Sequence, residues 1–162
     1  MESKERKIDL IKYRLELAEE KLKSSEILLN NGQYKDSVGR SYYAIYSALR
    51  AIMAKDGVDH HKHSGVISDF QKNYIKTGIF EKNFSLFLTE AFQVRNACDY
   101  DDFYIVSKAD AEQQLLNASE ILKATKEYLQ NYINEITKVT MQEETNIVSE
   151  DIGVYRCKGK SR

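Results

Sequence analysis

Residues 34–51 read YKDSVGRSYYAIYSALRA, and this stretch decides the fold class of the 162-residue chain. Its apolar side chains recur at intervals of three and four residues, which predicts a helix from about Tyr34 to Lys55 with one buried face. The positions on this face are Val38, Tyr42, Ile45, Leu49 and Ile52. Small residues at 44, 48 and 51 lie beside it, where a neighbouring helix can approach closely.

The same periodicity recurs along most of the chain. The chain has seven glycines and no proline, a composition that favours long helices joined by short loops. Gly32, Gly57 and Gly78 follow predicted helices as stops, whereas Ser64 and Ser107 are expected to cap the starts of two others. The further helices are expected at about Ser3–Asn30, Ser64–Ile75, Glu81–Asp99 and Ser107–Thr137. We therefore predict an all-α, up-and-down bundle of four long helices plus one short helix.

The C-terminal segment follows a different pattern. The helical period is lost after Lys138, and acidic residues there precede basic ones. We predict a bundle over residues 1–138 and a tail over residues 139–162 that is poorly ordered or serves as a docking segment. A short strand at Ile152–Cys157 is an alternative for part of this tail.

Charge and cysteine content limit the classes of function. The formal net charge is −1, which argues against a broad basic surface for nucleic acid and leaves only a local patch. No apolar run is long enough to span a membrane, and the charged N-terminus lacks the apolar core of a signal peptide. Cys98 and Cys157 are far apart and are typical of free thiols. We expect a cytoplasmic protein.

The segment RNACDY, residues 95–100, is the most informative for function. Arg95 falls on a core-facing stripe near the end of a helix, where a charge needs a partner. An ion pair with Asp99, one turn away, is the simpler explanation, and Asp101 or Asp102 is an alternative partner. The functional explanation is an arginine that binds phosphate.

Two other groups are candidates for binding. His63, the last residue of the HHKH loop at 60–63, directly precedes a predicted helix start and is a candidate at an anion site. Arg40 and Tyr43 share a polar face of the second helix with Arg50. The histidine spacing fits no common zinc pattern, and the chain has no glycine-rich phosphate loop or nucleophile elbow. We therefore expect no metal and no cofactor.

Four segments in this order resemble the HEPN domain (higher eukaryotes and prokaryotes nucleotide-binding), and most closely its small stand-alone prokaryotic branch. They are residues 34–51, 63–67, 74–80 and 95–103, and the resemblance covers about residues 5–137. It implies a homodimer whose subunits meet around the helix that contains Arg95. It also implies binding of a nucleotide or RNA, often as one component of a toxin–antitoxin or defence pair with a minimal nucleotidyltransferase.

The resemblance also raises the question of catalysis. Nuclease members of the family carry an arginine, a polar residue and, after a few more residues, a histidine. Arg95 and Asn96 match the first two positions, but Tyr100 occupies the histidine position. Tyrosine has a pKa near 10 and is a poor proton acceptor at neutral pH, whereas histidine suits that role.

Three functions therefore stay open. The first is a nucleotide- or RNA-binding module that uses Arg95, Asn96, Asp99 and Tyr100, with Arg40, Tyr43 and His63 as further candidates. The second is a metal-independent endoribonuclease that uses Arg95 with Tyr100 or with a displaced histidine. The third is a purely structural or partner-binding bundle.

Overall fold

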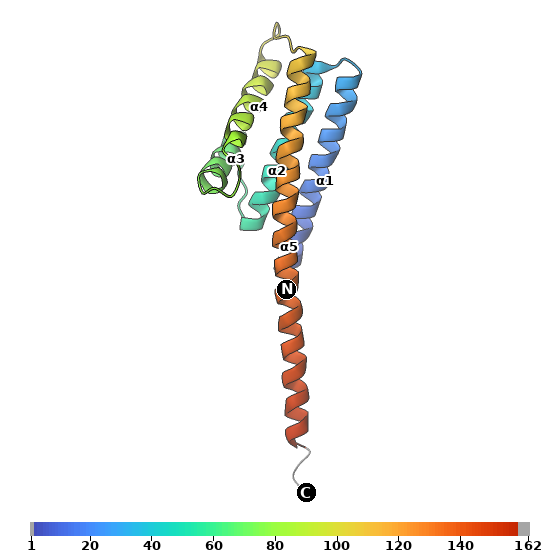
Figure 1. Cartoon of the computed structure of the whole chain (residues 1–162), viewed down its shortest axis with the longest axis vertical. Helices are drawn as coiled ribbons and strands as arrows, with labels where there is room; N and C mark the ends of the chain where they lie inside the picture. Colours follow the sequence, from blue (N-terminus) through green and yellow to red (C-terminus); the bar gives the residue numbers. More distant parts are fainter. Residues whose placement is uncertain (1, 159–162) are drawn as a thin grey trace. The chain divides into compact units, whose positions relative to one another are not determined.

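The structure is a computed structural model that describes the backbone of residues 2–158 and the side chains of residues 4–143 and 145–148. The described residues form an all-helical protein, as the periodicity predicts (Figure 1). Its elements are α1 (Glu2–Asn30), α2 (Tyr34–Asp56), α3 (His63–Phe70), the π-helical turn η1 (Gln71–Ile75), α4 (Asn83–Tyr100) and α5 (Lys108–Lys158). The chain divides within α5 into two compact units, residues 1–127 and 128–162.

Glycines end two of the long helices, as predicted. Gly32 and Gly57 have φ angles of 74° and 72°, a left-handed conformation that an L side chain rarely adopts. The amide N–H of Gly57 closes the last turn of α2 by donating to the carbonyl of Ala54. The stop at Gly32 allows α2 to turn back along α1 after a short loop (Figure 1).

Helix α2 lies at the centre of the first unit. The five predicted positions of its apolar stripe are all at most 2% exposed. The strip of alanines is fully buried, and Ala48 packs with Ala18 of α1 and Leu122 of α5. Burial of a large aliphatic side chain contributes about 1.5–3 kcal/mol, so this stripe makes a large contribution to the stability of the bundle.

The short helix differs from the prediction in two details. Helix α3 begins at His63, and the cap position is Lys62, whose side chain makes no capping bond. The prediction of Ser64 as the N-cap was therefore wrong. The expected single helix to Ile75 is also interrupted, because its last turn is π-helical, with the Lys76 amide bonded to the Gln71 carbonyl.

Helix α5 begins with the predicted capping box. The Asp110 amide donates to Ser107 Oγ at 3.0 Å, and Asp110 Oδ2 accepts from the Ser107 amide at 3.3 Å. The helix then continues to Lys158, so the predicted end at Thr137 and the alternative of a strand at Ile152–Cys157 were both wrong. No described helix combines the length and the apolar character needed to cross a bilayer.

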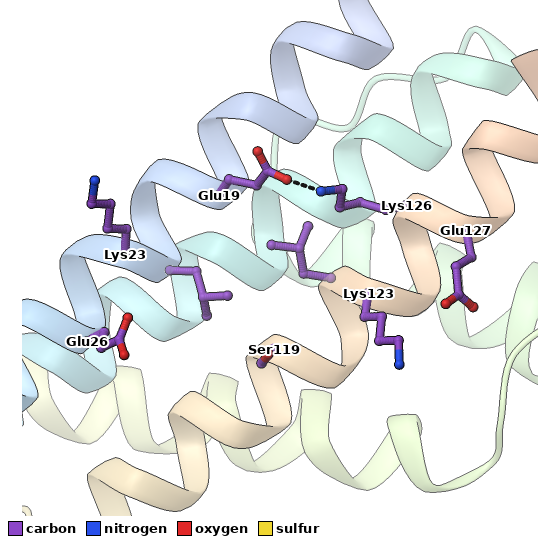
Figure 2. A pocket seen from close by; sticks show the side chains of 9 residues that line it. Glu19, Lys23, Glu26, Ser119, Lys123, Lys126 and Glu127 are labelled. Carbon is purple, nitrogen blue, oxygen red and sulfur yellow. Dashed lines mark hydrogen bonds and ion pairs between the residues drawn. The ribbon is translucent and has the colours of Figure 1, made fainter.

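A hollow of about 470 Å³ lies between α1 and α5 within the first unit. Leu22 and Leu122 line it together with charged side chains, and Lys126 pairs with Glu19 across it (Figure 2). The charges alternate in sign, and both members of this ion pair are about half exposed. This hollow therefore has no concentrated charge that would favour an anionic ligand.

Candidate functional site

Arg95 projects from α4 toward α2 and is held by three polar neighbours. Its Nη2 donates to the Tyr43 hydroxyl at 3.1 Å, and its Nη1 donates to Asn96 Oδ1 at 3.1 Å. Its Nε lies 3.0 Å from Asp99 Oδ2, an ion pair without the alignment of a hydrogen bond. The predicted Arg95–Asp99 pair is therefore confirmed, and only 18% of the arginine side chain is exposed.

Aromatic rings cover the Arg95 guanidinium. Its Cζ lies 5.7 Å from the ring centre of Tyr42 and 5.8 Å from that of Tyr43, which is within cation–π range. Burial alone lowers the pKa of Arg95, but the Tyr43 hydroxyl and the Asp99 carboxylate outweigh it and raise the pKa above its usual value. The guanidinium is thus a permanent charge in a fixed orientation.

His63 contacts the same two tyrosines. Its Nδ1 is 2.8 Å from the Tyr42 hydroxyl, and its ring stacks on Tyr46 with centroids 4.0 Å apart. Its ring also meets the edge of Tyr43 at 6.0 Å. The structure therefore brings His63 of α3 and Arg95 of α4 onto the same pair of rings from α2, a proximity that the sequence did not reveal.

The environment keeps both partners of the Tyr42–His63 hydrogen bond neutral. Burial raises the pKa of Tyr42 well above its usual range, so the phenol stays protonated. Burial, followed by the charges of Arg95 and Arg50, lowers the pKa of His63. At neutral pH the imidazole is therefore neutral, and its Nε2 can accept a proton in the tautomer in which Nδ1–H donates to the Tyr42 hydroxyl.

A cavity of about 520 Å³ adjoins the Arg95 cluster. It is lined by Tyr43 and Asp99, which both contact Arg95, by the cations Lys35 and Arg40, and by the carboxylate of Asp36. Arg40, predicted from the polar face of α2, is exposed and thus available to a ligand. The two lining cations are balanced by two carboxylates, but Arg95 behind Tyr43 and Asp99 adds a third cation, and this excess of positive charge suits a phosphate ester.

Tyr100 is separate from this arrangement. Its side chain is 81% exposed at the last residue of α4, whereas Arg95 faces the tyrosines of α2. The structure therefore brings together Arg95, Asn96, Asp99 and Tyr43. His63 contacts Tyr43 as well, and Arg40 lines the adjoining cavity. It does not place Tyr100 among the contacts of the guanidinium.

Two further residues of α2 extend the site. Arg50 lies over the ring of Tyr46 with its Cζ 5.9 Å from the centroid. Contacts thus run without interruption through Arg50, Tyr46, His63, Tyr43 and Arg95, and we name these five residues the cation–aromatic row. The spacing of Tyr43, Tyr46 and Arg50 at three and four residues placed them on one helical face, which was the available sequence signal.

The remaining histidines have other roles. His60 pairs with Asp69 of α3, whereas His61 is exposed in the loop. Within the described part of the chain, no three His, Cys, Asp or Glu side chains gather as a potential metal site. The site therefore consists of cations, tyrosines and one histidine from α2, α3 and α4.

Comparison with known proteins gives one family match and several similar proteins. Residues 11–128 match the HEPN domain. A protein of Methanocaldococcus jannaschii named "Putative toxin MJ0142" is 34% identical over 115 residues, which cover 71% of this chain and 78% of the relative. A second protein of that organism, named "Putative toxin MJ0605", is 34% identical over 53% of this chain and 64% of its own length.

A relative from Thermotoga maritima, named as a UPF0332 protein, is 28% identical over 75% of this chain and 92% of its own length. The matched region contains α2, α3 and α4 and therefore every residue of the cation–aromatic row. The family match, the helical bundle and the arginine at the end of α4 agree, and the chain belongs to the HEPN domain family.

Proposed function

We propose that this protein is a HEPN-type module that binds the phosphate groups of RNA or nucleotides and serves as a toxin-like component of a two-component pair. One observation carries the proposal: the Arg95 guanidinium is oriented by Tyr43, Asn96 and Asp99 beside a cavity lined by Lys35 and Arg40. An arginine with a fixed orientation and a partly exposed carboxylate partner can exchange that carboxylate for a phosphate.

RNA binding is tested with a fluorescein-labelled single strand of about twelve nucleotides, a length that covers a typical single-strand site. The titration is run at about 50 mM salt, because phosphate contacts weaken steeply as salt rises. Arg95→Gln is expected to bind about tenfold more weakly, because it loses a charge-assisted contact. Lys123→Gln removes an exposed cation from α5 and is the matched control.

Two further arms identify the ligand. Competition by adenosine monophosphate reports binding of free nucleotides, and a DNA strand of the same sequence reports any use of the 2′-hydroxyl. Arg95→Lys keeps the charge but loses the planar fork, so partial loss indicates directional recognition of phosphate. Equal affinities for Arg95→Gln and Lys123→Gln would refute the assignment of the site, and absence of binding at low salt would leave the structural bundle as the function.

Cleavage of RNA is a second candidate function, and the position of His63 favours it. In this reaction the 2′-oxygen attacks phosphorus, the bond to the 5′-oxygen breaks, and a 2′,3′-cyclic phosphate and a 5′-hydroxyl form. An unprotonated His63 is suited to accept the 2′-hydroxyl proton, while water protonates the leaving 5′-oxygen. Arg95 is suited to stabilise the charge on the phosphorane.

Cleavage is tested with end-labelled RNA in the presence of a chelator. His63→Asn and Arg95→Gln are expected to abolish product, whereas Tyr100→Phe leaves it intact if His63 is the base. Loss in Tyr100→Phe alone would instead assign the reaction to the tyrosine in the motif position. Substrate with a 2′-deoxy residue at the scissile position should stay uncut, and no cleavage by the wild type would leave the binding module as the function.

The proposed assembly is a homodimer whose subunits meet around α4, with a minimal nucleotidyltransferase as the partner protein. The toxin names of two relatives support the toxin-like part of this proposal. Light scattering should give twice the monomer mass of 18.8 kDa at micromolar concentration. Induced expression in bacteria should arrest growth, and both Arg95→Gln and co-expression of the nucleotidyltransferase should relieve the arrest.

We also propose that residues 1–138 suffice for binding and that residues 139–162 serve as a docking segment. A chain that ends at Lys138 keeps the whole cation–aromatic row and the buried core of α2. It is expected to bind RNA with unchanged affinity and to lose affinity for the partner. Weaker RNA binding by a folded truncated chain would place part of the RNA site in the tail.

A further inference from the structure

A second cationic cluster lies at the far end of the cation–aromatic row. Arg50 Nη2 donates to the Asp59 carboxylate at 2.8 and 3.2 Å, and Arg14 Nη2 lies 3.5 Å from the same carboxylate. Arg14 also donates from Nη1 to the Arg50 carbonyl at 2.7 Å. Two guanidiniums from α1 and α2 thus converge on one carboxylate of the loop before α3.

The cluster has an excess of positive charge. Asp59 faces Arg50, Arg14 and His61, so its single negative charge neutralises only one of two guanidiniums. The Arg14 side chain is 10% exposed, whereas those of Arg50 and Asp59 are 34% and 54% exposed. Arg14 is therefore a buried charge behind the other two side chains, and Arg50 and Asp59 form the part that a ligand can reach.

The hydrogen-bonding capacity of Arg50 is not filled. Among the described side chains, its Nε is one of the few buried polar atoms without an acceptor. Exposed ion pairs contribute about 0–1 kcal/mol, so stability alone is a weak reason to hold Asp59 over two arginines. A half-exposed carboxylate that faces two guanidiniums has the chemistry of an exchangeable anion.

We propose that Arg50, supported by Arg14, is a second phosphate-binding position for single-stranded RNA, and that Asp59 occupies it in the free protein. The proposal rests on the proposed function, because the first phosphate binds at Arg95. Tyr43, which bonds Arg95, lies seven positions before Arg50 in α2, a rise of about 10 Å along the helix. Tyr46 and His63 lie between them, so one strand passes two cations and intervening aromatic rings, a typical single-strand site.

The test compares Asp59→Asn and Arg50→Gln in the RNA titration described above. Asp59→Asn is expected to tighten binding severalfold, because no carboxylate competes with phosphate. Arg50→Gln is expected to weaken binding about tenfold and to reduce the salt slope by about one. Glu120→Gln and Lys123→Gln change the same charges at exposed positions of α5 and are the matched controls.

RNA length gives a second readout. A dinucleotide without terminal phosphates carries a single phosphate and cannot occupy both positions at once, so Arg50→Gln should affect its binding much less than that of the strand of about twelve nucleotides. If Arg50→Gln does not fold, Asp59→Asn decides alone, because unfolding does not produce tighter binding.

Three results separate the outcomes. If Asp59→Asn binds like Glu120→Gln and Arg50→Gln binds like Lys123→Gln while Arg95→Gln loses affinity, the second position is refuted and the proposed function stands. If the wild type binds no RNA at low salt, both proposals fall. Tighter binding by Asp59→Asn together with weaker binding by Arg50→Gln supports both.

Discussion

Two polar regions of α2 show how differently buried polarity is used in this bundle. Toward the start of the helix, Ser37 and Ser41 meet Ser25 of α1, and all three are at most 1% exposed. Ser25 Oγ donates to the Ser37 carbonyl at 2.8 Å or bonds the Ser41 hydroxyl at 2.7 Å, and Ser37 Oγ donates to the Ser25 carbonyl at 2.9 Å. We name these residues the serine cluster.

The cation–aromatic row differs from the serine cluster in charge, exposure and saturation. The serine cluster is neutral and closed, so it joins α1 to α2 without any capacity for a ligand. In the row, Arg50 and Arg95 pair with partly exposed carboxylates, and His63 is unprotonated at neutral pH. The members of the row come from three helices. The contrast teaches that a closed polar cluster serves stability, whereas a half-open one retains capacity for binding.

The largest effect is expected from a substitution that disrupts the serine cluster. Ser25→Val removes its hydrogen bonds and adds volume at a fully buried position, so the free energy of unfolding should fall by about 3 kcal/mol. Urea unfolding monitored by circular dichroism measures it. Ser24→Val is the control, because the Ser24 hydroxyl bonds only along its own helix to the Glu20 carbonyl. An equal loss in both variants would contradict the role of the cluster.

A smaller effect is expected where the two regions of α2 meet. Tyr42→Phe keeps the buried ring but removes the hydroxyl that bonds His63, so the free energy of unfolding should fall by about 1 kcal/mol. Thermal unfolding measures the change. Tyr13→Phe, at a side chain that is 61% exposed, should leave stability unchanged. A loss of several kcal/mol in Tyr42→Phe would show that the row is as closed as the serine cluster.

The titration of His63 should show that the arginines of the row act on the pKa of this histidine. Burial and the neighbouring arginines lower its pKa below the unperturbed value of 6.5. As pH falls below that value the unfolded chain takes up the proton first, so stability is lost from there down through the folded pKa. Arg95→Gln removes one cause and should raise the pKa of His63 in a histidine NMR titration. If the pKa of His63 changes no more in Arg95→Gln than in Lys123→Gln, the charge of Arg95 does not act on His63.

The smallest effect is expected at the exposed ion pair between α1 and α5. Lys126→Ala breaks the contact with Glu19 seen in Figure 2, yet both side chains are about half exposed. The expected loss in the free energy of unfolding is below about 0.5 kcal/mol. RNA affinity should be unchanged, because the pair is not part of the row. A loss as large as that of Ser25→Val would remove the distinction between open and closed polar contacts.

Local patterns in the sequence were sufficient for most of the helices. The periodicity of α1 and α2, the glycine stops and the Ser107–Asp110 capping box all depend on residues within one or two turns of each other. The Arg95–Asp99 pair was predictable for the same reason, since residues four apart on a helix are neighbours. The start of α3 was not predictable in this way, because the side chain at its cap, Lys62, makes no capping bond. Its π-helical end was not predictable either, since buried Phe70 and Tyr74 there contact residues from outside this helix.

The sequence by itself determined the helical class, the ends of α1 and α2, and Asp99 as a candidate partner of Arg95, because each depends on contacts between near neighbours. It did not determine the end of α5, which the pattern placed at Thr137 and the structure places at Lys158. Only the tertiary structure decided that His63 and Arg95 share the tyrosines of α2. It also decided that Arg14 and Arg50 converge on Asp59. These contacts join residues distant in sequence, and the packing of whole helices, which no local spacing encodes, brings them together.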